Sequence, residues 1–323
     1  MGAPPPHRIL RGPHLPTIWA SLFRTVPKFS TRSERVELSD GDFVDLAWAG
    51  NQGGPIVLVL HGLEGSLESS YARAVMLELL THGYAVALMH FRGCSGEPNR
   101  LDRSYHSGDT GDLAEVIQHI ERQAGSAPAA VVGYSLGGNV VLKWLGERGS
   151  GAPIRAAVAI SVPFDLAASA DRLNEGFSKI YQRRLVNSMQ DKFLRRFRNR
   201  RPPVEFSDVR EFNTFWAFDD AVTAPLHGFR DVHHYYAESS SRGFLRDIHV
   251  PALIVHARDD PFVPERAIPT ASELSDSITF ELYDTGGHVG FVGQGRLGEP
   301  TYWLERRIRT YLDEHCRTSA GPR

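Results

Sequence analysis

Short apolar runs recur along the chain, and most of them end in Gly, Asp, His or Ser. Runs of this kind are typical of strands that are buried on both faces of a sheet. They lie at residues 55–62, 84–93, 129–135, 155–164, 251–260 and 278–288. Ahead of the first run, residues 35–50 hold two alternating stretches around Asp40-Gly41, which predicts a β-hairpin.

Helical periods separate most of these runs. Apolar residues recur at intervals of three and four, and each stretch stops at a glycine, as helices commonly do. The pattern predicts helices over residues 70–83, 109–125 and 136–149. Because strands that alternate with helices need crossover connections, we expect an α/β fold with a mostly parallel central sheet and helices on both of its faces.

The alternation breaks over one long interval that is aromatic, charged and mostly helical in pattern. An insertion between strands at this point predicts a helical lid over the carboxyl ends of the sheet. We therefore expect a core formed by residues 35–164 and 250–317, with a lid over residues 165–249. Residues 1–34 are expected to pack on this body, and residues 318–323 to form a polar tail.

Two segments allow a choice between a structural and a binding role. Six of the ten residues in the lid segment 192–201 are basic. We interpret this run as a solvated helix face, and recognition of phosphate or an acyl carrier is the alternative. In residues 16–29, four apolar side chains either pack on the main body, which we favour, or lie along a lipid surface. They are Ile18, Trp19, Leu22 and Phe23.

Charge and cysteine content narrow the class of protein. Thirty-six basic and 38 acidic residues give a formal charge of −2, so the balance favours a small, nearly neutral substrate over nucleic acid or an anionic membrane. No stretch reaches the length of a membrane span. Cys94 and Cys316 are the only cysteines and match neither a disulfide framework nor zinc-ligand spacing. We expect a soluble cytoplasmic protein that needs no metal; the sequence leaves its oligomeric state open.

Residues 133–137 read Gly-Tyr-Ser-Leu-Gly and join a predicted strand to a predicted helix. A sharp turn in this setting holds the serine in a strained conformation with its hydroxyl exposed, and the two glycines leave room for it. The free N–H groups of the new helix, including that of Leu136, point toward developing negative charge. The motif predicts Ser135 as a nucleophile; a glycine-rich turn with a capping serine is the alternative.

A nucleophilic serine needs a base, and the base needs an acid that orients it. His288 follows the last predicted strand in a glycine-rich loop that allows the imidazole to swing over the sheet. Asp259 and Asp260 both stand at the end of the preceding strand, where one could orient His288 and the other could cap a helix or bind the loop backbone. The order serine, acid, histidine is that of α/β-hydrolases and differs from both protease orders.

The turn after the run 55–62 is the candidate for a second oxyanion donor. In His61-Gly62-Leu63-Glu64-Gly65, the N–H of Leu63 can point at the space above Ser135. We expect His61 and Glu64 to brace this turn.

We interpret three further polar residues and one cysteine as structural residues that take no part in catalysis. Arg92, Asp109 and Asp112 form a structural polar network, with a substrate-binding ring as the alternative. Cys94 has no partner motif that would make it a nucleophile.

Several stretches together resemble the YheT-like branch of the α/β-hydrolase superfamily, which includes yeast medium-chain ester synthase/esterases and animal phospholipase-like proteins. They are RGPHLPTIWAS near the start, HGLEGSLESSYARA, MHFRGCSGEPNRLDRSYHSGDTGDL, GYSLGGN, HARDDPF and GGHVGF. The resemblance implies a carboxylic ester hydrolase with Ser135 as nucleophile, His288 as base and Asp260 as acid. We expect this enzyme to need no cofactor. Asp260 is favoured over Asp259 because the acid of related enzymes stands four residues before the closing proline, here Pro264.

The first functional hypothesis is a serine esterase that acts on short- to medium-chain acyl esters or lipids as small-molecule substrates. An alcohol acyltransferase (ester synthase) that uses the same three residues is the second. The absence of the His-x-x-x-x-Asp pattern found in some relatives favours water over an alcohol as acceptor. A non-catalytic member that binds a lipid or another ligand is the third.

Overall fold

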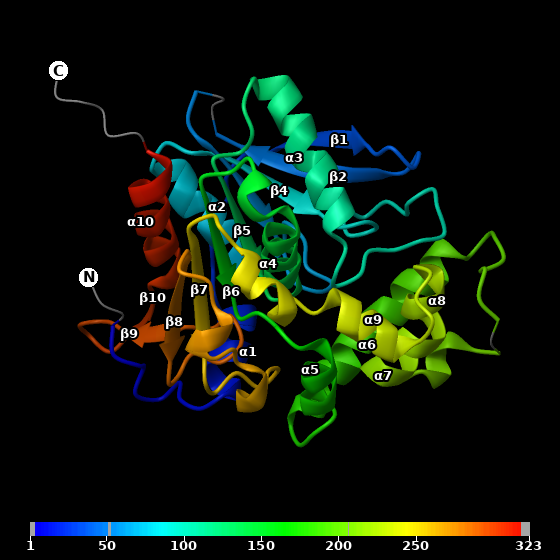
Figure 1. Ribbon diagram of the computed structural model, residues 1–323. Coiled ribbons are helices and arrows are strands. Elements are labelled where there is room, and N and C mark those ends of the chain that lie inside the picture. Colours follow the sequence, from blue (N-terminus) through cyan, green and yellow to red (C-terminus); the bar gives the residue numbers. More distant parts are fainter. Residues whose placement is uncertain (1–3, 51–52, 206, 318–323) are drawn as a thin grey trace.

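A twisted, mostly parallel sheet forms the centre of the protein (Figure 1). The computed structural model describes residues 4–50, 53–205 and 207–317, and within these ranges eight strands form the sheet in the order β1-β2-β4-β3-β5-β6-β7-β8. The strands are β1 (Arg32–Glu37), β2 (Phe43–Ala49), β3 (Ile56–Leu60), β4 (Ala85–His90), β5 (Ala130–Tyr134), β6 (Ala156–Ile160), β7 (Ala252–Ala257) and β8 (Ile278–Tyr283). Pairing from β4 to β8 is parallel, and β1 and β2 pair antiparallel at one edge. The predicted α/β class is confirmed.

The strand order reverses at β3, and this reversal creates the functional edge of the sheet. Leu58 of β3 pairs with Ala87 of β4 on one side and with Val131 of β5 on the other. The strands β3 to β7 are buried along their full length, as their continuous apolar sequences predict. In open α/β sheets the crevice outside the carboxyl ends at such a switch point is where ligands bind.

Helices cover both faces of the sheet, as Figure 1 shows. On one face lie α3 (Thr110–Ala124) and α4 (Leu136–Arg148), and on the other lie α2 (Ser70–Thr81) and α10 (Leu304–Cys316). The three helices expected from the sequence are present as α2, α3 and α4. Helix α10 and a small hairpin of β9 (Val292–Gln294) and β10 (Pro300–Tyr302) were not predicted.

Between β6 and β7 the chain forms a helical subassembly, called the cap below. It contains α5 (Leu166–Leu173), α6 (Ser178–Arg196), α7 (Phe215–Phe218), the π-helix η3 (Asp219–Thr223), α8 (Ala224–Leu226) and α9 (Val232–Ser239). The cap has its own apolar cluster, which includes Val186, Phe215 and Tyr236. Figure 1 shows these helices grouped to one side of the sheet. Short 3-10 helices join the remaining elements; they are η1 (Gly149–Gly151), η2 (Val209–Glu211), η4 (Arg242–Asp247), η5 (Glu265–Ala267) and η6 (Ala271–Glu273).

The N-terminal helix α1 (His14–Leu22) packs on the body through its small residues. Pro16, Thr17 and Ala20 are buried, because they form the side of the helix that faces the loop at residues 287–290 and the start of α2. The expectation that Leu22 and Phe23 pack on the body is wrong: each is 60% exposed, at the end of the helix and away from that side. Within the described residues no helix is long and apolar enough to cross a membrane.

The basic run 192–201 is not a uniformly solvated face, which corrects our interpretation. Arg195 and Arg198 are exposed, whereas Lys192 and Arg196 point inward from α6. Lys192 and Arg196 are four residues apart, so they lie on the same side of the helix, one turn from each other. That side faces the body of the protein.

Candidate active site

Ser135 stands at the sharp turn between β5 and α4, at the carboxyl edge of the sheet. Its backbone has φ 51° and ψ −118°, a conformation that non-glycine residues rarely adopt. The two neighbouring glycines are required because any side chain would clash with the backbone. A Cβ on Gly133 would lie 2.4 Å from the Gly137 carbonyl oxygen, and a Cβ on Gly137 would lie 2.5 Å from the His61 carbonyl oxygen. The turn is fixed from the adjacent strand, since the Ser135 N–H donates to the Ile160 carbonyl at 2.8 Å.

The loop after β8 brings His288 to Ser135. The His288 Nε2 lies 2.9 Å from the Ser135 Oγ, and its Nδ1 lies 2.8 Å and 3.1 Å from the two carboxylate oxygens of Asp260. Asp260 is only 3% exposed. An ionised carboxylate accepts and cannot donate, so the Nδ1 carries the imidazole proton and the Nε2 is left to accept the serine proton.

The neighbouring aspartate has a different contact set. The Oδ1 of Asp259 accepts the N–H groups of Gly286 at 2.9 Å and Gly287 at 2.8 Å. Burial raises the pKa of Asp259. Of the two carboxylates that the sequence left open, Asp260 contacts His288, and Asp259 holds the loop on which His288 stands.

Three residues that sequence reasoning missed hold His288 in place. The Thr17 Oγ1 of α1 accepts the His288 N–H at 2.8 Å, and the Ser161 Oγ accepts the Val289 N–H at 3.0 Å. The ring of Phe262 stacks on the imidazole with 3.9 Å between centroids. Thr17 and Phe262 belong to stretches that carry the family resemblance, and this membership could have identified them as candidates from the sequence. Nothing in the sequence around Ser161 distinguishes it from other serines.

The turn after β3 lies directly against the serine. A Cβ on Gly62 would be 3.2 Å from the Ser135 Cβ. Within the described residues, neither the Leu63 N–H nor the Leu136 N–H donates a hydrogen bond. Both backbone donors named from the sequence are therefore free for a ligand oxygen, one from the turn and one from the first turn of α4.

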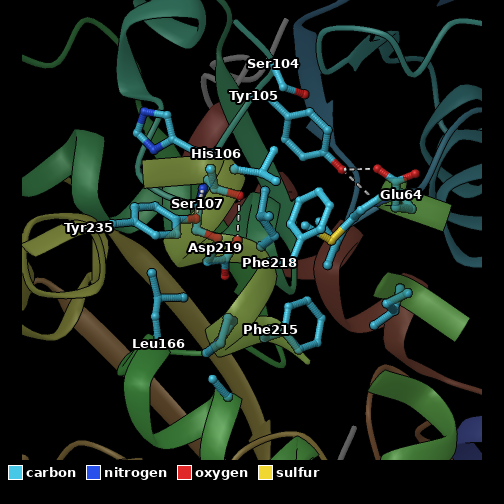
Figure 2. A pocket seen from close by; sticks show the side chains of 18 of the residues that line it. Glu64, Ser104, Tyr105, His106, Ser107, Leu166, Phe215, Phe218, Asp219 and Tyr235 are labelled. Carbon is cyan, nitrogen blue, oxygen red and sulfur yellow. Dashed lines mark hydrogen bonds between the residues drawn. The ribbon is translucent and has the colours of Figure 1, made fainter. Parts of the chain in front are cut away.

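Glu64 ties this turn to the cap. It has φ 57°, and its N–H donates to the hydroxyl of Tyr105 at 2.9 Å. Its carboxylate accepts hydrogen bonds from Tyr105 at 2.9 Å and from two α6 side chains, Ser188 at 2.7 Å and Lys192 at 2.6 Å. His61 braces the same turn from within, since its Nε2 accepts the N–H of Phe91. Figure 2 shows Tyr105 pointing toward Glu64 at the pocket wall.

A cavity that is partly open to solvent extends from Ser135 and His288 under the cap. Its wall is mainly apolar; the apolar members include Leu63, Leu136, Leu166, Leu173, Leu185, Met189, Phe193, Phe215, Phe218, Val222, Leu226 and Phe262. Polar groups lie among them, and Figure 2 shows Asp219 and Tyr235 in this wall. Burial raises the pKa of Asp219 to about 6, although Thr223 and Tyr236 donate hydrogen bonds to its carboxylate.

The polar network expected around Arg92 differs in its membership. Arg92 is 1% exposed and makes two bonds of 2.7 Å with Asp112, with Asp42 and Asp40 as further partners. Asp109 pairs with Arg103 instead. This network lies outside the set of residues that line the cavity.

Cys94 contacts the Lys192 Nζ at 2.9 Å, and burial raises the pKa of its thiol. In the described part of the chain, no three His, Cys, Asp or Glu side chains converge as metal ligands would.

A strained serine turn at the switch point, followed in the chain by an acid and a histidine that meet it, defines an α/β hydrolase of the esterase and lipase type. The chain belongs to that family: residues 55–293 match the family model of the alpha/beta hydrolase fold. It is 43% identical over 305 residues to a protein of Escherichia coli (strain K12) that is named "Putative esterase YheT", with 93% of this chain and 89% of that protein covered.

More distant comparisons agree with this class. The chain is 30% identical over 277 residues to a monoacylglycerol lipase of Saccharomyces cerevisiae, covering 80% of this chain and 60% of that protein. The structure of the esterase Pf2001 of Pyrococcus furiosus superposes on this chain with a TM-score of 0.58 at 15% sequence identity. The superposition covers 91% of this chain and 99% of the Pf2001 chain, and it shows that the two share a fold. The predicted family and enzyme class are confirmed.

Proposed function

We propose that the protein hydrolyses carboxylic esters through an acyl-enzyme on Ser135. The observation that carries this proposal is the continuous hydrogen-bonded chain from the Ser135 Oγ through His288 to Asp260. Such a chain allows a neutral imidazole to take the serine proton while a buried carboxylate stabilises the imidazolium that forms.

In the proposed reaction the Ser135 Oγ attacks the ester carbonyl carbon as its proton passes to the His288 Nε2. The carbonyl oxygen becomes an oxyanion, which the N–H groups of Leu63 and Leu136 stabilise. Collapse of this intermediate breaks the bond to the alcohol oxygen, and the alcohol leaves with the proton from His288. Water then attacks the acyl-enzyme by the same path, which releases the acid and regenerates Ser135.

The cavity supports an acyl ester as substrate class. Its mainly apolar wall begins at Ser135, and such a wall suits the acyl chain of an ester. A relative that is named a monoacylglycerol lipase supports the same class. We propose that residues 165–249 act as a lid that supplies much of this wall, because α5 to α9 contribute most of its aromatic side chains.

The proposal is tested with a fluorophosphonate probe and with p-nitrophenyl esters of increasing acyl length. We expect stoichiometric labelling and an esterase activity that are both lost in Ser135→Ala. Ser95→Ala is a matched control, since Ser95 lies in the near-miss stretch Gly-Cys-Ser-Gly-Glu and bonds to Asp45 instead of a histidine. Labelling that survives in Ser135→Ala, or its absence in the wild type, would refute the mechanism.

The same assay discriminates the two alternatives. When a primary alcohol is added, a dedicated acyltransferase would divert most of the acyl group to the new ester, whereas we expect mainly the free acid. A non-catalytic ligand-binding member would bind the esters without turnover or labelling.

A further inference from the structure

The exposed apolar side chains of the protein gather on one part of its surface. Within the described residues, the large exposed apolar side chains other than Leu194 come from three segments: residues 9–23, the turn of the β9-β10 hairpin and the start of α6. We call these side chains the apolar surface; they are Ile9, Leu15, Leu22, Phe23, Leu297, Phe177 and Ile180. Exposed apolar groups that gather in this way mark interaction sites.

The three segments contact one another. The chain before α1 runs along the β9-β10 hairpin, as Figure 1 shows, and the His7 Nε2 lies 3.0 Å from the carbonyl oxygen of Gly298, the neighbour of Leu297. At the other side, the imidazole of His14 lies against the start of α6, with 4.5 Å between its centroid and that of Phe177. The apolar surface thus extends from the hairpin along α1 to the cap.

Helix α1 is apolar on the side that faces away from the protein. Leu15, Ile18 and Leu22 recur at intervals of three and four residues and therefore lie on one side of the helix. At about 100° per residue, this side is opposite the buried side at Thr17 and Ala20. A surface helix normally turns its apolar stripe to the core and a polar face to water. A helix that is apolar on both sides fits a second apolar medium outside the protein.

The same surface carries cations that the protein does not neutralise. Residues 1–33 contain five basic residues and no acidic one, an excess that the formal charge of −2 for the whole chain does not show. Arg24 and Arg32 form ion pairs with glutamates. Glu175, next to the start of α6, lies 4.0 Å from Arg172. Six further exposed cations of these segments have no ion-pair partner among the described residues; they are Arg8, Arg11, Lys28, Lys179, Arg183 and Arg184.

We propose that the apolar surface docks on an anionic lipid surface. The side chains of Leu22 and Phe23 enter the acyl region, and the six unpaired cations lie against the headgroups. Amphipathic helices with flanking cations bind lipid in this way, through apolar burial together with attraction to anionic headgroups. A second copy of this chain is a poorer occupant, because it would bring the unpaired cations of two copies together. This proposal goes beyond the proposed function, since docking requires no turnover.

Docking would place the lipid beside the proposed catalytic loop. On the buried side of α1, the Thr17 hydroxyl accepts the His288 N–H. At the cap, Tyr181 bonds to His14 and lies 5.0 Å, between ring centroids, from Phe262, which lines the cavity. The apolar surface is therefore separated from the cavity by one helix and a pair of rings. An ester dissolved in the lipid would be concentrated next to the cavity.

The experiment measures sedimentation of the full chain with vesicles of phosphatidylcholine alone and of phosphatidylcholine mixed equally with phosphatidylglycerol. We expect tighter binding to the mixed vesicles. Leu22→Gln with Phe23→Gln should weaken this binding by at least about tenfold. Arg8→Gln with Arg11→Gln and Lys28→Gln should weaken it by about 10- to 100-fold.

The far end of α6 provides matched controls. Leu194 is exposed and lies about 21 Å along the helix from Ile180. Leu194→Gln removes an exposed apolar side chain, and Arg195→Gln with Arg198→Gln removes two exposed cations. Both controls should bind the mixed vesicles as the wild type does. Thermal unfolding of every variant checks that these surface changes leave the fold intact.

Three results would overturn the proposal. They are the absence of binding to the mixed vesicles, equal binding by the wild type and Leu22→Gln with Phe23→Gln, and a lipid-free dimer that this double variant dissociates in analytical ultracentrifugation. The dimer would assign the apolar surface to a second copy of the chain. Hydrolysis of p-nitrophenyl acetate, a water-soluble ester, tests the esterase separately, and it should be equal in the wild type and all surface variants. Failure of docking thus leaves this hydrolysis intact, and failure of the esterase leaves vesicle binding intact.

Discussion

Thr17 joins the N-terminal helix to the proposed catalytic histidine, and its hydroxyl can be removed without changing the shape of the side chain. The Oγ1 donates to the Pro13 carbonyl at 2.7 Å and accepts the His288 N–H at 2.8 Å. The α1 backbone also approaches this loop closely, since a Cβ on Gly287 would be 2.8 Å from the Pro13 carbonyl oxygen. Thr17→Val keeps the β-branch and leaves the His288 N–H without its acceptor.

The size of the effect follows from that lost acceptor. An unsatisfied buried donor costs about 1–3 kcal/mol. If this cost falls on the loop conformation that holds the imidazole against Ser135, the active population falls by roughly 5- to 150-fold. Thr17 does not line the cavity, so substrate binding is unaffected. We therefore expect kcat to fall by roughly 5- to 150-fold, with KM almost unchanged.

The assay is steady-state hydrolysis of a p-nitrophenyl ester by the wild type, Thr17→Val and Thr17→Ser. Thr17→Ser keeps the hydroxyl and should retain most of the activity, and thermal unfolding of each variant reports global stability. Equal kcat in Thr17→Val and the wild type would show that α1 does not position His288. A parallel loss in Thr17→Ser would assign the effect to packing of the methyl group instead.

Other substitutions test the remaining geometry. Asp260→Asn should lower kcat by about 10³- to 10⁴-fold, because an amide no longer fixes the imidazole tautomer. Asp259→Asn keeps an oxygen acceptor for the loop, so its kcat should stay within about tenfold of the wild type. Equal losses of kcat in the two variants would contradict the assignment of Asp260 as the acid. Gly137→Ala should prevent folding, since its Cβ would lie 2.5 Å from a carbonyl oxygen. Soluble expression measures this effect. Gly53→Ala is the control and should express normally, because a Cβ on Gly53 would meet no atom within 4 Å. Asp219 has a pKa raised from 3.8 to about 6. The folded state therefore binds more protons between about pH 4 and 6, and stability falls as the pH rises through that window. Asp219→Asn should remove up to roughly 3 kcal/mol of this fall in urea unfolding, and an unchanged pH dependence would contradict it.

Local patterns were sufficient to predict the sheet and the residues at its edge. The continuous apolar runs identified β3 to β8, and the serine turn, the acids and the histidine follow from their places at strand ends. Helix α10 was missed although Leu304, Ile308 and Leu312 repeat at helical spacing and are all buried. The hairpin β9-β10 has only three residues in each strand, too few to show an alternating pattern.

Contacts between distant segments could not be predicted in this way. The Thr17 hydroxyl meets His288 across 271 residues of sequence, and Ser161 meets Val289 across 128. The direction of Arg196 is also set by tertiary packing, because charge alone predicts a solvated helix face and the inward side of α6 is determined by the apolar cluster of the cap. The sequence shows which residues have the chemistry, and the fold decides which of them meet.

Backbone strain is concentrated at the proposed site. Within the described ranges, the non-glycine residues with positive φ are Glu64, Ser135, Ser161, Val289 and Phe291. They lie in the turn after β3, in the turn at Ser135 and in the segments that hold His288. Each such conformation costs about 1–3 kcal/mol, so together they cost an amount comparable with the net stability of a typical domain.

Strain of this size persists only where the surroundings over-determine the backbone, and here the fully buried strands β3, β5 and β6 provide that constraint. The turns at the carboxyl edge are then the first parts to relax when the constraint weakens. In a urea titration, ester hydrolysis should accordingly be lost at a lower concentration than the far-UV circular dichroism of the sheet and helices. Coincident transitions would mean that the strained turns and the sheet unfold as one cooperative unit.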